Sequence, residues 1–202
     1  MQRRTFINLG LVGLGTTFTM AKANPGPLQY IPKPSKEKWA ILFGTWCGTA
    51  RDASIWISEG LGGIASVYDI RQKPDLSSFD HLIIGTAIHG GKGPKELDTY
   101  LQSNASELKS KIRGLFAVCG NLGKQPGPPQ KKDYIDNYLA QICQVQGVPS
   151  QIFGGRITKA LLSPEDNKVV EGLYKSLNIA FEDYDNLSRL ECITFGKKIL
   201  GG

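Results

Sequence analysis

The sequence lacks the features that identify several large functional classes. It contains no G-x-S-x-G segment, so a serine hydrolase of the α/β type has no nucleophile turn. Its two histidines, four cysteines and carboxylates show no spacing typical of metal ligands. The formal net charge is only +6, and no basic stripe with interleaved aromatic residues occurs. We therefore expect neither a metal site nor nucleic-acid binding.

The overall composition is ordinary for a globular protein. Of the 202 residues, 41% are hydrophobic and 21% are charged. A chain of this length has enough apolar residues for one well-formed core, with some residues left for an extension. The composition predicts a soluble domain of the α/β or α+β class.

The N-terminus differs in kind from the rest of the chain. Arg3 and Arg4 precede a modestly apolar, glycine-containing stretch over residues 9–20, and Ala21-Lys22-Ala23 supplies an A-x-A cleavage pattern. This arrangement is typical of a twin-arginine export signal cleaved after Ala23, which predicts a periplasmic protein. The alternatives are a membrane anchor and an amphipathic helix, but the apolar stretch is too short to span a bilayer. We expect a signal over residues 1–23, a proline-rich tether over 24–37 and one domain over 38–202.

The first apolar run of the domain leads into a turn that could bind an anion. Residues 40–43 read as a buried strand, and a helix is expected from residue 49 to about 61. The turn between them places backbone N–H groups and two hydroxyls at the positive end of that helix, where phosphate is commonly bound. It is neither a Gly-Lys-Ser/Thr loop nor a G-x-G-x-x-G fingerprint, and an ordinary strand-turn-helix connection is the alternative.

Further strands and helices alternate along the chain. The pattern predicts strands over residues 64–70, 81–88, 114–119 and 151–157, and helices over 94–109, 133–146, 164–177 and 185–200. Pro94 is expected at the first helical position and Asp133 as a helix cap. Right-handed crossovers then favour a parallel five-stranded sheet of order 2-1-3-4-5, covered by helices on both faces. In such a sheet the loops at 45–49, 86–93 and 121–132 meet at the carboxyl ends of the strands.

Three segments together resemble the flavodoxin-like superfamily, a three-layer α/β sandwich. Residues 43–51 resemble the phosphate loop for flavin mononucleotide (FMN) in the branch of menaquinone-dependent protoporphyrinogen dehydrogenases. Residues 79–91 are similar to that branch's strand and loop written YD-x-V-V-I-G-A-S-I-R-Y-G, and residues 116–122 and 133–139 to its fourth strand and following helix. Where that pattern has Arg-Tyr, this chain has His89-Gly90. The predicted export also argues against a role in haem synthesis, because that branch's substrate is made and used on the cytoplasmic side of the membrane.

The resemblance implies FMN as cofactor and assigns three groups of binding residues. One group would hold the phosphate: Thr45, Trp46, Cys47, Gly48 and Thr49. A second would lie along one side of the isoalloxazine ring: Thr86, Ala87, Ile88, His89 and Gly90. The third would lie along the other side: Asn121, Leu122 and Gly123. Neither the resemblance nor the sequence itself indicates a catalytic acid or base in this chain.

The implied function is that of an exported oxidoreductase that transfers electrons or hydride, with a quinone or a membrane redox partner. The alternatives are an electron carrier without a substrate and a flavin-free binding protein of the same fold. For three residues of the candidate site an ordinary structural role is the alternative to a role toward the flavin. Trp46 and His89 could be solvated loop residues, and Cys47 could be a small loop residue without redox chemistry.

The four cysteines are expected to stay unpaired despite the predicted export. Cys47 and Cys119 follow strands that lie roughly 10 Å apart in the predicted order, beyond the reach of a disulfide. Cys143 and Cys192 fall on helices predicted to cover opposite faces of the sheet.

Overall fold

The computed structural model describes residues 30–201. The predicted signal over 1–23 lies outside the described residues, as does the first part of the predicted tether. Within the described part of the chain, no helix is long and apolar enough to cross a membrane.

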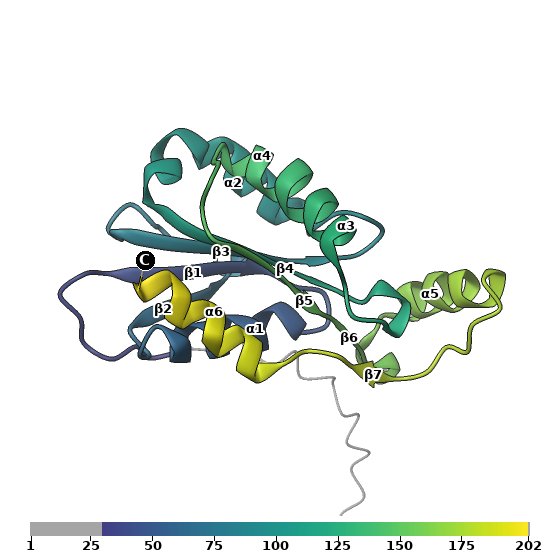
Figure 1. The fold of residues 1–202 in the computed structure, drawn as a ribbon. Helices are drawn as coiled ribbons and strands as arrows, with labels where there is room; N and C mark the ends of the chain where they lie inside the picture. The colour runs from purple at the N-terminus through teal and green to yellow at the C-terminus, as the bar shows by residue number, and fades with distance from the viewer. Residues whose placement is uncertain (1–29, 202) are drawn as a thin grey trace, which may run out of the picture.

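A five-stranded sheet forms the centre of the molecule (Figure 1). Its strands are parallel and run in the order β2-β1-β3-β4-β5, which confirms the predicted order. Their bounds are Trp39–Gly44 for β1, Ala65–Asp69 for β2, His81–Ile88 for β3, Ile112–Cys119 for β4 and Ser150–Gly154 for β5. The order reverses between β1 and β3, so the carboxyl ends of these strands are the expected place for a ligand.

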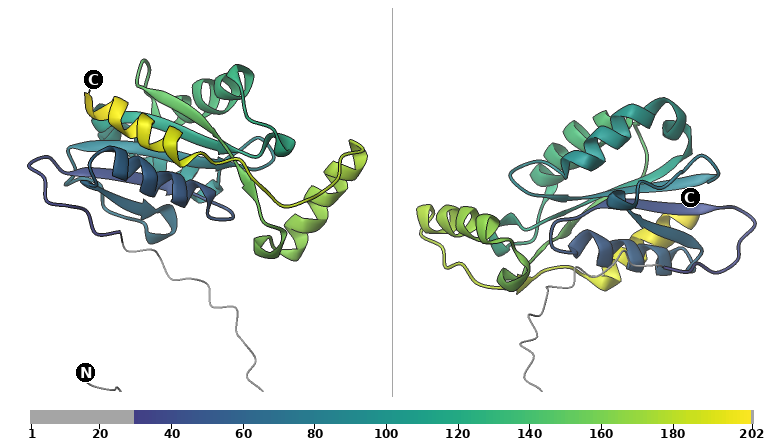
Figure 2. Two further views of the ribbon diagram at one scale, coloured as in Figure 1. Left: turned by 60° about the horizontal axis from the view of Figure 1, so that its bottom comes forward. Right: turned by 180° about the vertical axis from the view of Figure 1, so that it is seen from behind.

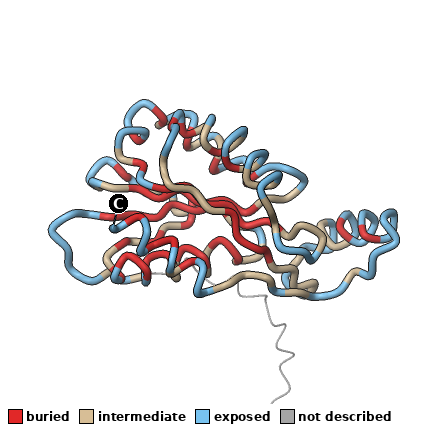
Figure 3. Tube along the Cα trace, viewed as in Figure 1, coloured by how far each residue is buried: buried red, intermediate tan, exposed pale blue. Residues whose placement is uncertain are grey.

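Helices cover both faces of the sheet, and alternate strand residues divide between two cores. On one face Leu42, Ile84 and Ala117 pack under α2 (Lys95–Leu108) and α4 (Ala140–Cys143). On the other, Ile41 and Phe116 pack against α1 (Thr49–Gly60) and α6 (Arg189–Gly201). Cys143 and Cys192 belong to opposite cores, as predicted, and all four cysteines are free. Burial on both faces explains the continuous apolar runs of the strands (Figure 3).

The helix after β4 begins earlier than the sequence suggested. It starts with α3 (Pro128–Lys131), continues through a π-helical stretch over Lys132–Leu139, called η4, and ends with α4. The expectation that Asp133 caps this helix is wrong, because Asp133 lies inside η4. Pro128 and Pro129 occupy the first helical turn, where their missing N–H groups cost nothing. Pro94, in contrast, is the N-cap of α2 rather than its first residue.

The chain between β5 and α6 differs most from expectation. The predicted strand over 151–157 ends at Gly154, and Arg156–Ile157 form a separate strand, β6, antiparallel to β7 (Tyr184–Asp185). The final helix begins at Arg189 rather than at Asp185, because Asp185 pairs with Arg156 in that two-stranded sheet. Between the two short strands lies α5 (Pro164–Ser176). We call residues 155–188 the projecting segment, because α5 extends beyond the sheet in every view (Figure 2).

Candidate functional site

The turn after β1 presents the backbone of a helix N-terminus to the carboxyl edge of the sheet. Gly48 is the N-cap of α1 and has φ +88°, a left-handed conformation that glycine adopts without strain. Its N–H donates to the Thr45 hydroxyl at 3.0 Å, which closes the turn. No side chain caps α1, so its first N–H groups remain available to a ligand. The Thr49 side chain is buried beside them, and its hydroxyl lies 3.5 Å from the Cys47 thiol.

The loop after β3 meets this turn through an aromatic contact. The rings of Trp46 and His89 lie edge to face with their centroids 5.3 Å apart. Trp46 is 48% exposed, so the pair stands at the surface, while Ala87 is buried. Two of the three loops expected at this edge therefore do come together.

A cavity of about 100 Å³ lies where these loops meet the projecting segment. Six of the predicted site residues line it: Trp46, Cys47, Thr49, Ala87, Ile88 and His89. The rest of the lining comes from the end of β4 and from the projecting segment: Val118, Gly120, Gly155, Arg156, Ile157, Leu162, Asp166 and Val170. The cavity therefore joins the loops expected from the sequence to a segment that sequence reasoning did not connect with the site.

Four other predicted residues of the first two loops lie near the cavity but do not line it. Thr45 and Gly48 shape the turn, and Gly90 is exposed beyond His89. Thr86 is buried and its hydroxyl donates to the Ala87 carbonyl at 3.3 Å. Their proposed roles toward a cofactor stay predictions.

The third predicted group faces β7 rather than the cavity. Asn121 and Leu122 have φ +40° and +54°, and Gly123 follows with φ +80°, so three successive residues are left-handed. Such a conformation is strained for leucine. The turn is held by Tyr184, whose hydroxyl donates to the Gly120 carbonyl at 3.0 Å, and by Asn186, whose amide donates to the Gly123 carbonyl at 2.8 Å.

A chain of charges connects α1 with the projecting segment. The Arg156 guanidinium donates to Asp52 in the first turn of α1 at 2.7 Å and to Asp185 of β7 at 2.8 Å. Asp52 also accepts from Arg51 at 3.1 Å. Burial lowers the pKa of Arg156, but its hydrogen bonds to the two carboxylates outweigh that effect and leave this pKa above its ordinary value. Arg156 therefore stays charged, and the network is electrically balanced.

Tyr138 fixes the far end of the loop after β3. Its hydroxyl donates to Asp98 at 2.6 Å and accepts from the Gly93 N–H at 2.8 Å. Burial and the neighbouring carboxylate raise the pKa of Tyr138, so the phenol is neutral. Local sequence patterns do not associate Tyr138 with the candidate site.

The titratable groups around the cavity do not form a recognisable catalytic set. Residues 30–201 contain no group of three or more histidine, cysteine or carboxylate side chains placed to hold a metal ion. Burial raises the pKa of the Cys119 thiol, so this cysteine is not a ready nucleophile. The arrangement combines a helix N-terminus with hydroxyls at one end and an apolar cavity at the other.

Comparison with known proteins identifies a family for most of the chain. The family model described as "Flavodoxin domain" matches residues 40–180. No curated protein sequence gives a significant match. Among solved structures, flavodoxin 1 of Bacillus cereus has 14% identity and a TM-score of 0.48, covering 82% of this chain and 98% of its own. Reduced flavodoxin of Megasphaera elsdenii has 15% identity and a TM-score of 0.49, covering 81% and 98%.

Proposed function

The chain belongs to the flavodoxin domain family, and from this premise we propose that it binds FMN and transfers electrons outside the cytoplasm. The observation that carries the proposal is the uncapped N-terminus of α1, where Thr45, Gly48 and Thr49 lie beside a cavity at the carboxyl edge. This is where a parallel sheet of this order binds its ligand. The export signal read from residues 1–23 supports the location.

The phosphate end of the site fits FMN. The first N–H groups of α1 can donate to phosphate oxygens, and the positive end of the helix dipole favours the anion. Thr45 and Thr49 add hydroxyl groups from either side of Gly48. These residues would bind and orient the phosphate, while the chemistry of electron transfer belongs to the flavin itself when it is bound.

The ring end does not fit FMN in the conformation described. The cavity of about 100 Å³ is smaller than the roughly 300 Å³ at which small-molecule sites begin. We therefore assign no redox step to the residues that line it. This observation also favours the second candidate function, that of a flavin-free binding protein of the same fold.

The first experiment is the visible absorption spectrum of the mature protein, with FMN added if it purifies without colour. Flavin bands that stay with the protein through gel filtration would support the proposal. A protein that stays colourless and does not retain added FMN would overturn it and leave the flavin-free alternative. If flavin is retained, the reduced protein is mixed with a soluble quinone. Rapid oxidation by the quinone would support the proposed quinone partner, and no oxidation would favour an electron carrier without a substrate.

The phosphate site is tested with a variant of the turn. Thr45→Val removes the hydroxyl that accepts the Gly48 N–H, and we expect FMN to bind about tenfold more weakly. Riboflavin, which has no phosphate, should bind both proteins equally. Thr99→Val, on the exposed side of α2, is the matched control. An equal loss of both ligands in Thr45→Val would show that the turn does not bind phosphate.

A further inference from the structure

The projecting segment crosses the carboxyl edge of the sheet. In the observed order β5 is separated from β1 by two strands, a distance of roughly 14 Å. Arg156 follows the end of β5 by two residues, yet its carbonyl accepts from the Cys47 thiol at 3.5 Å and its side chain reaches Asp52 of α1. The chain therefore passes over the place where the resemblance puts the flavin.

The sheet edge forms one wall of the cavity, and the projecting segment forms the other. At the sheet edge, Ala87 and Val118 are buried among strands that are hydrogen-bonded on both sides. The opposite wall includes Leu162, Asp166 and Val170 of the projecting segment. Most of α5 is exposed (Figure 3), and Val169 and Leu173 are 60% and 50% accessible to solvent. The buried residues of α5 are Val170 and Tyr174, and a helix with few buried contacts separates from the body at low cost.

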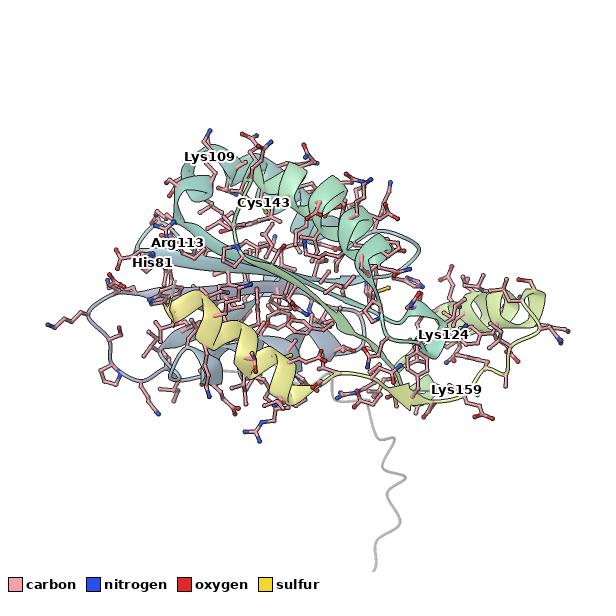
Figure 4. The ribbon with its side chains drawn as sticks, in the orientation of Figure 1. His81, Lys109, Arg113, Lys124, Cys143 and Lys159 are labelled. Carbon is pink, nitrogen blue, oxygen red and sulfur yellow. The ribbon has the colours of Figure 1, made fainter. Side chains whose placement is uncertain are left out.

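Polar contacts, together with the packing of Leu187 against the core on the α1 face, hold the projecting segment to the body. Among residues 30–201, the ion pair that joins the two is Arg156 with Asp52, at 2.7 Å and with both side chains about one-fifth exposed. The hydrogen bonds from Tyr184 and Asn186 to the turn after β4 hold β7. Lys124 and Lys159 mark this end of the molecule, while His81 and Arg113 lie at the other end (Figure 4).

We infer that the projecting segment is a gate over the flavin site and that the Arg156–Asp52 ion pair is its latch. The inference rests on the proposed function, because the isoalloxazine ring needs more room than the cavity of about 100 Å³ provides. Opening moves Leu162, Asp166 and Val170 away from the sheet edge and leaves the phosphate turn in place. The Arg156–Asp185 pair lies within the segment and moves with it.

The test compares rates of flavin entry into two α1 variants. Asp52→Asn removes the charge of the latch, and Glu59→Gln removes the partner of Arg189 in another ion pair of the same helix. Riboflavin is the main probe, because its uncharged tail is not attracted or repelled by the altered charge. We expect Asp52→Asn to raise the association rate constant of riboflavin about tenfold, as for the loss of one charged hydrogen bond, and Glu59→Gln to leave it unchanged.

A third variant distinguishes the Arg156–Asp52 pair from the other ion pair of Arg156. Asp185→Asn removes the charge that faces Arg156 in β7 and keeps the contact of Arg156 with Asp52. We expect no faster entry of riboflavin. If Asp185→Asn and Asp52→Asn accelerate entry equally, the Arg156–Asp52 pair is not the latch.

Amide hydrogen exchange tests the gate without any flavin. The amides of β6, α5 and β7 should exchange at least fivefold faster in Asp52→Asn than in the wild type, and those of the five-stranded sheet should be unaffected. Unchanged exchange in the projecting segment would overturn the inference. Failure of every variant, and of the wild type, to bind flavin would instead overturn the proposed function, while the exchange data still decide on the latch.

Discussion

Gly60 of α1 and Gly196 of α6 lie directly against each other where the two helices cross. A Cβ atom on Gly196 would collide with the Ile57 carbonyl oxygen, and one on Gly60 with that of Ile193. The two backbones therefore leave no room for a side chain at either position. This crossing lies on the face of the sheet that carries α1, the first helix of the candidate site. Neither glycine has a positive φ, so close packing and not turn geometry requires the missing side chain.

Gly196→Ala should lower the free energy of unfolding by about 1–3 kcal/mol, because the added methyl group forces α1 and α6 apart. Gly172→Ala is the matched control, since it lies in the middle of α5 with open space at its Cβ position. Alanine there should stabilise α5 by about 0.5–1 kcal/mol. Urea unfolding measures both. Equal effects of the two substitutions would contradict the close helix crossing.

Tyr138→Phe should lower the free energy of unfolding by about 1–2 kcal/mol, because it leaves the Gly93 N–H without its partner. It should also loosen the loop after β3, which amide exchange of residues 89–93 can detect. Tyr134→Phe, on the same helix, is the control. If both variants lose the same stability, the hydroxyl of Tyr138 does not anchor the loop.

Asp98 should make stability depend on pH in a defined direction. Burial raises the pKa of this carboxyl, against the opposing effect of the hydrogen bond from Tyr138. The folded state thus binds the proton more tightly than the unfolded state, and ionisation of Asp98 costs stability as the pH rises above about 4. Asp98→Asn keeps an acceptor for Tyr138 and cannot ionise.

We therefore expect the free energy of unfolding of Asp98→Asn, relative to the wild type, to increase between pH 4 and pH 7. The gain should be a few tenths of a kcal/mol, since solvent screens this partly exposed group. Urea unfolding at three pH values measures it. A gain that shrinks as the pH rises would show that the pKa of Asp98 is lowered instead.

One thiol should react rapidly in the folded protein. Burial raises the pKa of Cys143 and of Cys192 to about 12 and also raises that of Cys119, so these three are protonated and covered. Cys47 is partly exposed at the cavity. Alkylation at pH 8 without reductant should label about one thiol per chain before unfolding and four after it. Fewer than four after unfolding would reveal a disulfide and contradict the observed strand order.

Local sequence patterns determined the sheet and the part of the candidate site that the loops after β1 and β3 form. The apolar runs at 40–43 and 81–88 predicted buried strands because burial on both faces requires continuous apolar residues. Gly48 and the flanking threonines marked the turn at the helix N-terminus, since these residue types have local backbone preferences. The crossover rule then placed the loops after β1 and β3 together, and the structure confirms that they meet.

Only the tertiary structure decided what closes the site. Strands of two residues, such as Arg156–Ile157 and Tyr184–Asp185, are too short to show periodicity, and their pairing joins residues far apart in sequence. The contact of Arg156 with Asp52 spans 104 residues and leaves no local signal. Sequence indicated a helix over 164–177 but not its position, because a helix with an exposed apolar face does not specify which surface it contacts. Packing of the whole chain placed it against the cavity.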